Sequence, residues 1–233
     1  MADKLKIPVA TVPDHLIKTL HKVDSPTVAN AIETFDLRDR CAGFIGGRIA
    51  CRFPDLGPMV GQALTVTMTS QPGDVPDRDG YWQMWETLAK MPTPSVLVIA
   101  DASGAPHRCA YAGEIMATLA KRLGAVGMVS DGGLRDLNEV HALRFHYFMP
   151  FPVVSHGNFE IIDVGSPVTI DGEQIRTGDL LHGDVNGIVV IPPEAFDDLE
   201  DRIQIIQAKE SMTLEFIRGR AFTLEEFKRQ SGY

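Results

Sequence analysis

Two short segments hold the side chains best suited to chemistry. Residues 127–139 read GMVSDGGLRDLNE, and residues 113–116 read GEIM. The guanidinium of Arg135 presents a planar fork of donors that suits a carboxylate, and the carboxylate of Asp136 is a hard oxygen ligand for Mg²⁺, which normally keeps several waters. If a short helix follows the glycines, Glu139 lies about one turn beyond this pair on the same side, where it can order metal-bound water. These residue types predict a magnesium site for a small anion.

Each part of this pattern also has an ordinary structural interpretation. An Arg-Asp dipeptide is common as a surface ion pair or a helix cap, and a pair of glycines is common between a strand and a helix. His107, in the loop before residue 113, is suited to contact a substrate, but a solvated loop histidine is the plainer interpretation. Asp101 fits either a supporting role in a site or a turn, and His141 fits an exposed helix position. The residues alone leave both interpretations open.

The elements around these segments predict where a ligand would bind. Residues 95–100 (SVLVIA) are continuously apolar, as in a strand buried on both faces, and residues 126–129 form a second such run. A helix over residues 112–123 lies between them, so the three form a right-handed βαβ unit with parallel strands. Ligands of such units bind at the carboxyl ends of the strands, which residues 101–116 and 130–136 follow. The free N–H groups at the helix start would add donors for an anion.

The chain is predicted to fold as one mixed α/β domain with strands in more than one layer. Its expected parts are N-terminal helices in residues 1–45, a core in 46–192 and C-terminal helices in 193–233. Ser25 is the expected N-cap of one N-terminal helix, with Pro26 at its first helical position. The expected elements are helices over 13–20, 25–35, 81–89, 194–219 and 224–230, strands in 46–51, 61–68 and 147–154, a turn-rich loop at 71–80 and a meander of short strands over 159–191.

Composition argues against several classes of protein. The 22 basic and 31 acidic residues give a net charge of −9 without any basic run, which argues against a nucleic-acid partner. Cys41, Cys51 and Cys109 lack CxxC spacing, so a disulfide framework or a structural zinc site is not expected. No apolar run approaches the ~20 residues of a membrane span, and the first residues lack the apolar core of a signal peptide, so we expect a cytoplasmic protein. The sequence contains no HExxH, GxSxG, Walker or GxGxxG motif. Trp82 and Trp85 are interpreted as core or subunit-interface anchors.

Three motifs together resemble one known family. GEIM at Gly113, Glu114, Ile115 and Met116, the run at 127–139 and GDVNGIVVIP at 183–192 resemble the class II 4-hydroxy-4-methyl-2-oxoglutarate aldolases and RraA-like proteins. The resemblance extends over residues 25–219. It implies that residues 113–116 and Arg135 hold the pyruvoyl part of a substrate, and that Asp136 ligates a divalent metal such as Mg²⁺ or Mn²⁺. The Arg-Asp-x-x-Glu pattern is associated with aldolase members, whereas ribonuclease-regulator members can lack the metal-binding Asp. Because Asp136 and Glu139 are both present, the resemblance favours an enzyme.

The same resemblance implies a fold, an assembly and a reaction. The fold is a swivelling β/β/α-type layered domain with a central βαβ unit, a β-meander and a long C-terminal helix, assembled as trimers or hexamers. An acidic residue of a neighbouring subunit would complete the site, and Glu210 on the C-terminal helix is the candidate. The implied reaction is metal-dependent retro-aldol cleavage of a 4-hydroxy-2-oxo acid, such as 4-hydroxy-4-methyl-2-oxoglutarate, to pyruvate, accompanied by oxaloacetate decarboxylation. One alternative is a non-enzymatic regulator that binds a ribonuclease or another protein. Another is a different lyase or a methyltransferase on the same scaffold, for which no nucleotide or methyl-donor motif is present.

Overall fold

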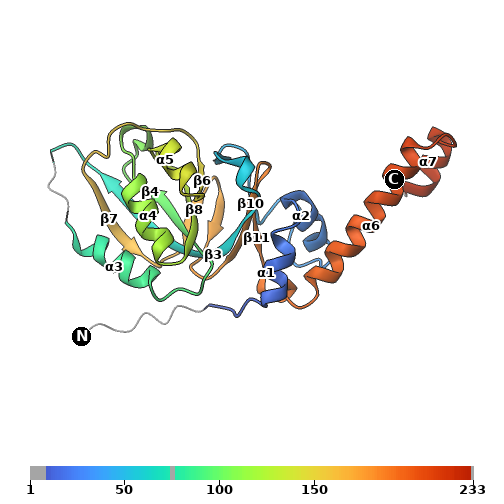
Figure 1. Cartoon of the computed structure of the whole chain (residues 1–233), viewed down its shortest axis with the longest axis horizontal. Helices are drawn as coiled ribbons and strands as arrows, with labels where there is room; N and C mark the ends of the chain where they lie inside the picture. Colours follow the sequence, from blue (N-terminus) through green and yellow to red (C-terminus); the bar gives the residue numbers. More distant parts are fainter. Residues whose placement is uncertain (1–8, 74–76, 232–233) are drawn as a thin grey trace.

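The computed structural model describes residues 9–73 and 77–231, and its main feature is a central mixed sheet (Figure 1). The expectations for the first eight residues and for the middle of the 71–80 loop lie outside the described residues. The order of strands in the sheet is β1-β11-β10-β3-β4-β5-β6-β2, and β7 also pairs with β3. The strands are β1 (Phe44–Ile45), β2 (Ala50–Cys51), β3 (Met59–Ser70), β4 (Ser95–Asp101), β5 (Ala125–Ser130), β6 (His146–Met149), β7 (Phe159–Val164), β10 (Leu180–Asp184) and β11 (Gly187–Ile191).

The predicted βαβ unit is confirmed at the centre of this sheet. Strands β4 and β5 are parallel, and α4 (Glu114–Arg122) connects them. Strand β4 is continuously apolar because both of its faces are buried. Leu97 and Ile99 pack in the cluster beneath the helices, whereas Val96 and Val98 pack in the cluster on the other face.

The sheet lies between a helical layer and a small hairpin. Helices α3 (Asp79–Leu88), α4 and α5 (Leu137–Ala142) contribute side chains to the cluster on one face. On the other face, β8 (Val168–Ile170) and β9 (Glu173–Ile175) form an antiparallel hairpin that packs on the second cluster. This order of hairpin, sheet and helices agrees with the predicted layered β/β/α fold.

The N-terminal helices pack on the β10–β11 end of the sheet. They are α1 (Asp14–Leu20) and α2 (Ser25–Glu33). The N-cap of α2 is Asp24, whose side chain accepts the Thr27 N–H at 2.8 Å, so the prediction of Ser25 was wrong by one residue. The Ser25 hydroxyl instead lies 3.0 Å from Nδ1 of His182, a contact that links α2 to β10.

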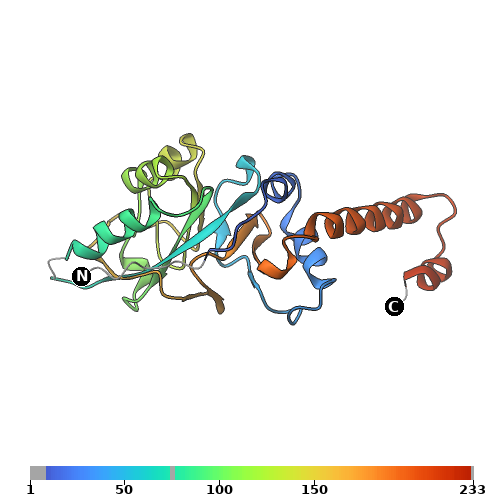
Figure 2. The same ribbon diagram turned by 90° about the horizontal axis from the view of Figure 1, so that it is seen from below.

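The C-terminal helices extend away from the sheet (Figures 1 and 2). The long helix was predicted to begin at residue 194, but α6 spans Leu199–Arg218 and follows a separate 3-10 turn at Pro193–Ala195. The reason is local: the Pro192–Pro193 pair starts the tight turn, and Asp198 at φ −110° and ψ −3° separates it from the helix. Leu199 and Ile203 are buried, as the predicted apolar face requires, but the second half of α6 leaves the body of the molecule.

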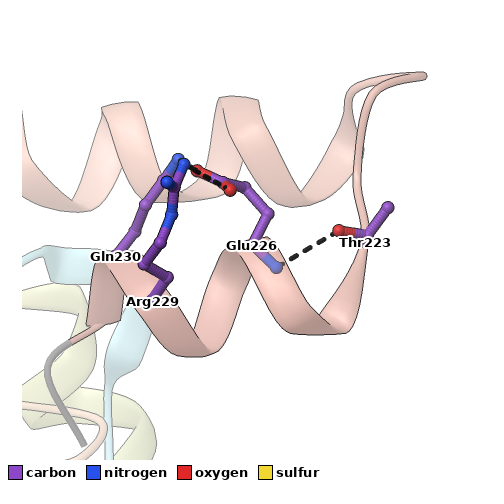
Figure 3. Close-up of polar contacts among 4 residues, drawn as sticks. All are labelled: Thr223, Glu226, Arg229 and Gln230. Carbon is purple, nitrogen blue, oxygen red and sulfur yellow. Dashed lines mark hydrogen bonds and ion pairs between the residues drawn. The ribbon is translucent and has the colours of Figure 1, made fainter.

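Helix α7 (Leu224–Ser231) is stabilised by contacts within its own turns (Figure 3). The Thr223 hydroxyl accepts the Glu226 N–H at 3.2 Å, which satisfies a free donor of the first turn. The Glu226 carboxylate in turn accepts hydrogen bonds from Arg229 and Gln230 one turn later. Ring contacts from Phe227 to Phe222 and from Phe222 to Phe216 also connect this polar helix to α6.

Two further expectations need correction. The strand predicted over 147–154 ends at Met149, because Pro150 and Pro152 cannot donate to a ladder, and only a bridge between Leu134 and Pro152 continues it. The short strands predicted over 159–191 are present, but they do not pair only with one another: β7 pairs with β3, and β10 and β11 extend the central sheet. Among the described helices, none is both long and apolar enough to cross a membrane.

Candidate functional site

A cavity of about 570 Å³ opens beside the start of α4, on the side where β4 and β5 end. Its position agrees with the expectation that ligands of a βαβ unit bind at the carboxyl ends of the strands. Its size lies within the range of about 300–1,000 Å³ that is usual for small-molecule sites. The lining residues are Arg78, Tyr81, Trp82, Ala110, Tyr111, Ala112, Gly113, Glu114, Ile115, Met116, Arg135, Asp136, His156, Gly157 and Phe159.

Backbone hydrogen bonds bring the two predicted segments together. The Tyr111 N–H donates to the Gly133 carbonyl at 2.9 Å, and the Arg135 N–H donates to the Ala112 carbonyl at 3.0 Å. The segment before α4 therefore runs beside the turn that follows β5. As a result, residues 113–116 and the Arg135–Asp136 pair line the same cavity, as the sequence predicted.

Asp136 has an unusual backbone conformation and a specific partner. Its φ of 62° and ψ of 46° lie in the left-handed region, which aspartate tolerates better than most residues. Its side chain does not cap its own helix; instead, Oδ2 accepts the N–H of Glu114, the first residue of α4, at 2.8 Å. Gly113 makes this approach possible, because a Cβ at that position would lie 2.4 Å from the same oxygen.

The start of α4 provides donors for an anion, but fewer than predicted. Asp136 occupies the Glu114 N–H, and the first helical bond is donated by Ala117 to the Gly113 carbonyl at 2.9 Å. Within the described residues, the N–H groups of Ile115 and Met116 have no backbone or side-chain acceptor. These two groups, the Arg135 guanidinium and the Asp136 carboxylate form what we call the anion end of the cavity.

Arg135 is held loosely enough to bind a ligand. Its Nε lies 3.7 Å from Oδ2 of Asp136, and its Nη1 donates to the Val154 carbonyl at 3.3 Å. The side chain is 35% exposed, so the remaining N–H groups are available to the cavity. A guanidinium in this position can bind a carboxylate through two parallel hydrogen bonds.

A buried polar cluster supports the cavity from below. The Tyr111 hydroxyl donates to Oδ1 of Asp101, which also accepts the Ser103 hydroxyl at 2.6 Å. The Asp101 N–H donates to Oδ1 of Asp131 at 2.7 Å. Burial, together with the nearby charge of Asp101, raises the pKa of Asp131 to about 6. The pKa of Tyr111 is raised by burial and by its bond to Asp101, so the phenol stays protonated and fixed.

Tyr147 is a second buried phenol near the anion end. Its hydroxyl has no hydrogen-bond partner among the described residues. Burial raises its pKa, and the negative charge of Asp136 raises it further. The phenol therefore remains neutral beside the carboxylate.

Several residues considered from the sequence do not line the cavity. Glu139 is exposed in the first turn of α5, and His107 is exposed in the 3-10 turn at Pro106–Arg108. His141 lies 2.8 Å from a carboxylate oxygen of Asp55. Glu210 accepts a hydrogen bond from Asn30 at 3.1 Å, between α6 and α2 and away from α4 and α5 (Figure 1).

Apart from Arg78, which lies in the predicted turn-rich loop at 71–80, the part of the lining that we call the aromatic wall was missed in the sequence. It consists of Arg78, Tyr81, Trp82, His156 and Phe159, which come from the start of α3 and from the segment that enters β7. Trp85 is 5% exposed, as a core anchor should be, but Trp82 is 60% exposed and lines the cavity. No spacing in the sequence relates these residues to Arg135; only the packing of α3 beside β7 brings them there.

The anion end fits a metal ion that keeps most of its water. No group of three His, Cys, Asp or Glu side chains is arranged as a metal site within residues 9–73 and 77–231. Asp136 offers one carboxylate, and its Oδ1 makes no hydrogen bond to any described residue. Mg²⁺ is commonly held by one or two carboxylates together with water and substrate oxygens. The donor set therefore suits Mg²⁺ or Mn²⁺ and not a closed structural site.

Comparison with known proteins identifies the family. The model of the RraA-like family (Aldolase/RraA) matches residues 25–190. A protein of Halalkalibacterium halodurans named "Putative 4-hydroxy-4-methyl-2-oxoglutarate aldolase" is 36% identical over 101 residues, which are 43% of this chain and 48% of that protein. The chain thus spans about half the length of this curated relative.

Two solved structures have the same fold. An uncharacterized protein from Pseudomonas syringae pv. tomato aligns with a TM-score of 0.74 and 24% identity, over 97% of this chain and 98% of that one. Streptomyces coelicolor RraAS2, described as an unusual member of the RNase ES inhibitor RraA protein family, aligns with a TM-score of 0.67 and 21% identity, over 89% of this chain and 99% of that one. With the family model covering most of the chain and these structures sharing its fold, the chain belongs to the RraA-like (Aldolase/RraA) family.

Proposed function

We propose that this chain is a divalent-metal-dependent lyase that cleaves a 4-hydroxy-2-oxo acid to pyruvate and also decarboxylates oxaloacetate. One observation supports the proposal most strongly. The Arg135 guanidinium, the Asp136 carboxylate and the open N–H groups of Ile115 and Met116 meet at one end of a single cavity. The aldolase name of the Halalkalibacterium relative supports the same reaction class.

The anion end binds the part of the substrate that becomes pyruvate. The Ile115 and Met116 N–H groups and the Arg135 fork bind the carboxylate next to the 2-oxo group. Asp136 would hold the metal ion, which supplies a Lewis acid for the 2-oxo oxygen. Because the Glu114 N–H fixes Oδ2 of Asp136, the carboxylate needs no rearrangement when the substrate binds.

The reaction breaks one carbon–carbon bond. The hydroxyl on C4 loses its proton, the C3–C4 bond breaks, and C4 leaves as a carbonyl compound. The bonding electrons pass to C3 and form the enolate of pyruvate, whose negative charge Arg135 stabilises. Protonation at C3 then gives pyruvate. Decarboxylation of oxaloacetate forms the same enolate, so one site serves both reactions. Glu139 does not line the cavity, so its proposed role is indirect: from the first turn of α5 it would order the water that moves these protons.

Pyruvate release from oxaloacetate and from 4-hydroxy-4-methyl-2-oxoglutarate tests the proposal. We expect turnover with Mg²⁺ or Mn²⁺, loss of turnover with EDTA, and recovery when metal is added back. Asp136→Ala and Arg135→Lys should each lower kcat/KM by at least ~100-fold.

A matched control uses another exposed aspartate. Asp197→Ala removes an exposed carboxylate that does not line the cavity, and it should leave activity unchanged. Glu139→Gln should lower kcat without raising KM if Glu139 acts through water. Metal-independent turnover, or full activity in Asp136→Ala, would contradict the proposal. Absence of turnover with every metal would instead favour the protein-binding regulator.

A further inference from the structure

A second cationic group, Arg78, lines the same cavity as the anion end. Arg78 lies at the N-cap position of α3, and its side chain is exposed. Its guanidinium carbon lies 5.9 Å from the centre of the Tyr81 ring and 5.4 Å from the centre of the Phe159 ring. We call these two rings the aromatic cradle. Cation–π contacts of this kind hold a guanidinium in place while its N–H edges remain open.

Packing between α3 and β7 fixes the aromatic cradle. Gly80 lies so close to β7 that a Cβ there would be 2.0 Å from the Ile161 carbonyl oxygen. Tyr81 makes edge contacts with Trp82 and with the buried Trp85, at ring distances of 5.4 Å and 5.7 Å. Arg78 is therefore attached to a rigid part of the molecule through the residues that follow it.

Within residues 9–73 and 77–231, Arg78 has no carboxylate partner. None of the ion pairs in the described part of the chain includes it, although Asp77 and Asp79 are its neighbours in sequence. The Asp77 carboxylate instead accepts the Asp79 N–H at 3.0 Å. A guanidinium that lies over two rings and lines a ligand-sized cavity is well suited to bind a carboxylate that a ligand brings.

Two cationic groups line the same cavity: Arg135, beside the open N–H groups of α4, and Arg78, on the aromatic cradle. Glu114, the other acidic residue of the lining, donates its backbone N–H to Asp136, and its side chain forms no ion pair with Arg78 among the described residues. We propose that Arg78 and the aromatic cradle form a distal subsite that selects 4-hydroxy-2-oxo acids with a second carboxylate on C4. This inference rests on the proposed function for the reaction but on separate residues for the selectivity.

Kinetics with two substrates test the subsite. One substrate is 4-hydroxy-4-methyl-2-oxoglutarate, which has a carboxylate on C4, and the other is 4-hydroxy-2-oxopentanoate, which has only a methyl group there. Arg78→Met should raise KM for the dicarboxylate by about 10- to 30-fold with little change in kcat. The same variant should leave KM for the monocarboxylate unchanged. Arg78→Lys should give an intermediate KM for the dicarboxylate, because it keeps the charge and loses the planar fork.

Two further measurements separate this inference from the proposed function. Arg122→Met removes an exposed arginine that does not line the cavity, and it should leave both KM values unchanged. Calorimetric titration with 2-oxoglutarate and 2-oxobutyrate, in the presence of Mg²⁺, measures binding without turnover. A wild-type protein that cleaves neither substrate but binds 2-oxoglutarate more tightly, in an Arg78-dependent way, would contradict the lyase and support the subsite. Equal behaviour of the dicarboxylate and the monocarboxylate, or an equal effect of Arg78→Met on both, would overturn the subsite.

Discussion

The contact between Gly113 and Asp136 restricts which residue can occupy position 113. A Cβ there would lie 2.4 Å from Oδ2 of Asp136 and 3.0 Å from Cγ of Arg135. Neither partner can move freely, because the Glu114 N–H holds Asp136 and the Ala112 carbonyl holds the Arg135 backbone. We therefore expect Gly113→Ala to displace the anion end and to lower kcat/KM for oxaloacetate decarboxylation by about 100-fold.

The matched control for this prediction is Gly47→Ala, because a Cβ at residue 47 would meet no atom within 4 Å. Steady-state kinetics and urea unfolding of both variants separate a local effect from general destabilisation. The control should keep wild-type activity. Wild-type kcat/KM in Gly113→Ala would show that the contact does not position the site.

Asp131 gives the protein a specific dependence of stability on pH. Its pKa is about 6 in the folded state, against an ordinary value of 3.8, because the carboxylate is buried near Asp101. A raised carboxyl pKa means that the folded state binds the proton more tightly, so Asp131 makes folding less favourable as pH rises from about 4 through 6. Asp131→Asn should therefore be more stable than wild type at pH 7.5, by roughly 2 kcal/mol, and equal to it near pH 4.

Urea unfolding of both proteins across this pH range measures the difference. The comparison cancels the contribution of His146. Burial lowers the pKa of this histidine to about 4 from its ordinary value of 6.5, so it lowers the free energy of unfolding of both proteins equally as the pH falls below 6.5. Asparagine can still accept the Asp101 N–H, so the hydrogen bond is retained. A difference in stability that does not vary with pH would show that Asp131 titrates normally.

At the scale of elements, the approach of α3 to β7 positions the aromatic wall of the cavity. The Gly80–Ile161 contact leaves no space for a side chain on residue 80. Gly80→Ala should lower the free energy of unfolding by about 1–3 kcal/mol through overpacking. Because Arg78 and Tyr81 move with α3, the same variant should raise KM for a dicarboxylate substrate by a larger factor than it changes kcat. A loss of stability with no effect on KM would show that α3 does not position the subsite.

The sequence predicted correctly those elements whose residues show a regular pattern of burial. Strand β4 is apolar at every position because both of its faces are buried, and the turn after β5 carries Arg135 and Asp136 directly at the strand end. The predicted ends of helices and strands were wrong where a neighbouring residue overrides the hydrophobic pattern. The prolines after Met149 end β6 early, and Asp24 caps α2 in place of Ser25. The aromatic cradle was not predictable, because Tyr81 and Phe159 meet only through the long-range packing of α3 and β7.

At the scale of the whole molecule, the C-terminal arm leaves apolar side chains without cover. Helix α6 projects from the body (Figures 1 and 2), and Ile205, Met212 and Ile217 on it are exposed, with Met212 at 71%. Apolar exposure of this kind marks association surfaces. We propose that the trimer or hexamer implied by the family resemblance covers these side chains and brings Glu210 of one subunit to the cavity of the next.

Complementation between inactive variants tests this arrangement. If Glu210 acts in a neighbouring subunit, Asp136→Ala and Glu210→Gln should each be inactive alone, because every site lacks one group. Co-expressed and purified as mixed oligomers, they should regain about a quarter of wild-type activity, because some interfaces pair an intact Asp136 with an intact Glu210. Asp136→Ala mixed with Arg135→Ala is the control: both residues belong to one subunit's half of the site, so mixing cannot restore both. Light scattering confirms that the oligomers have formed. Failure of the mixed oligomers to recover activity, or a fully active Glu210→Gln protein, would exclude Glu210 from the site.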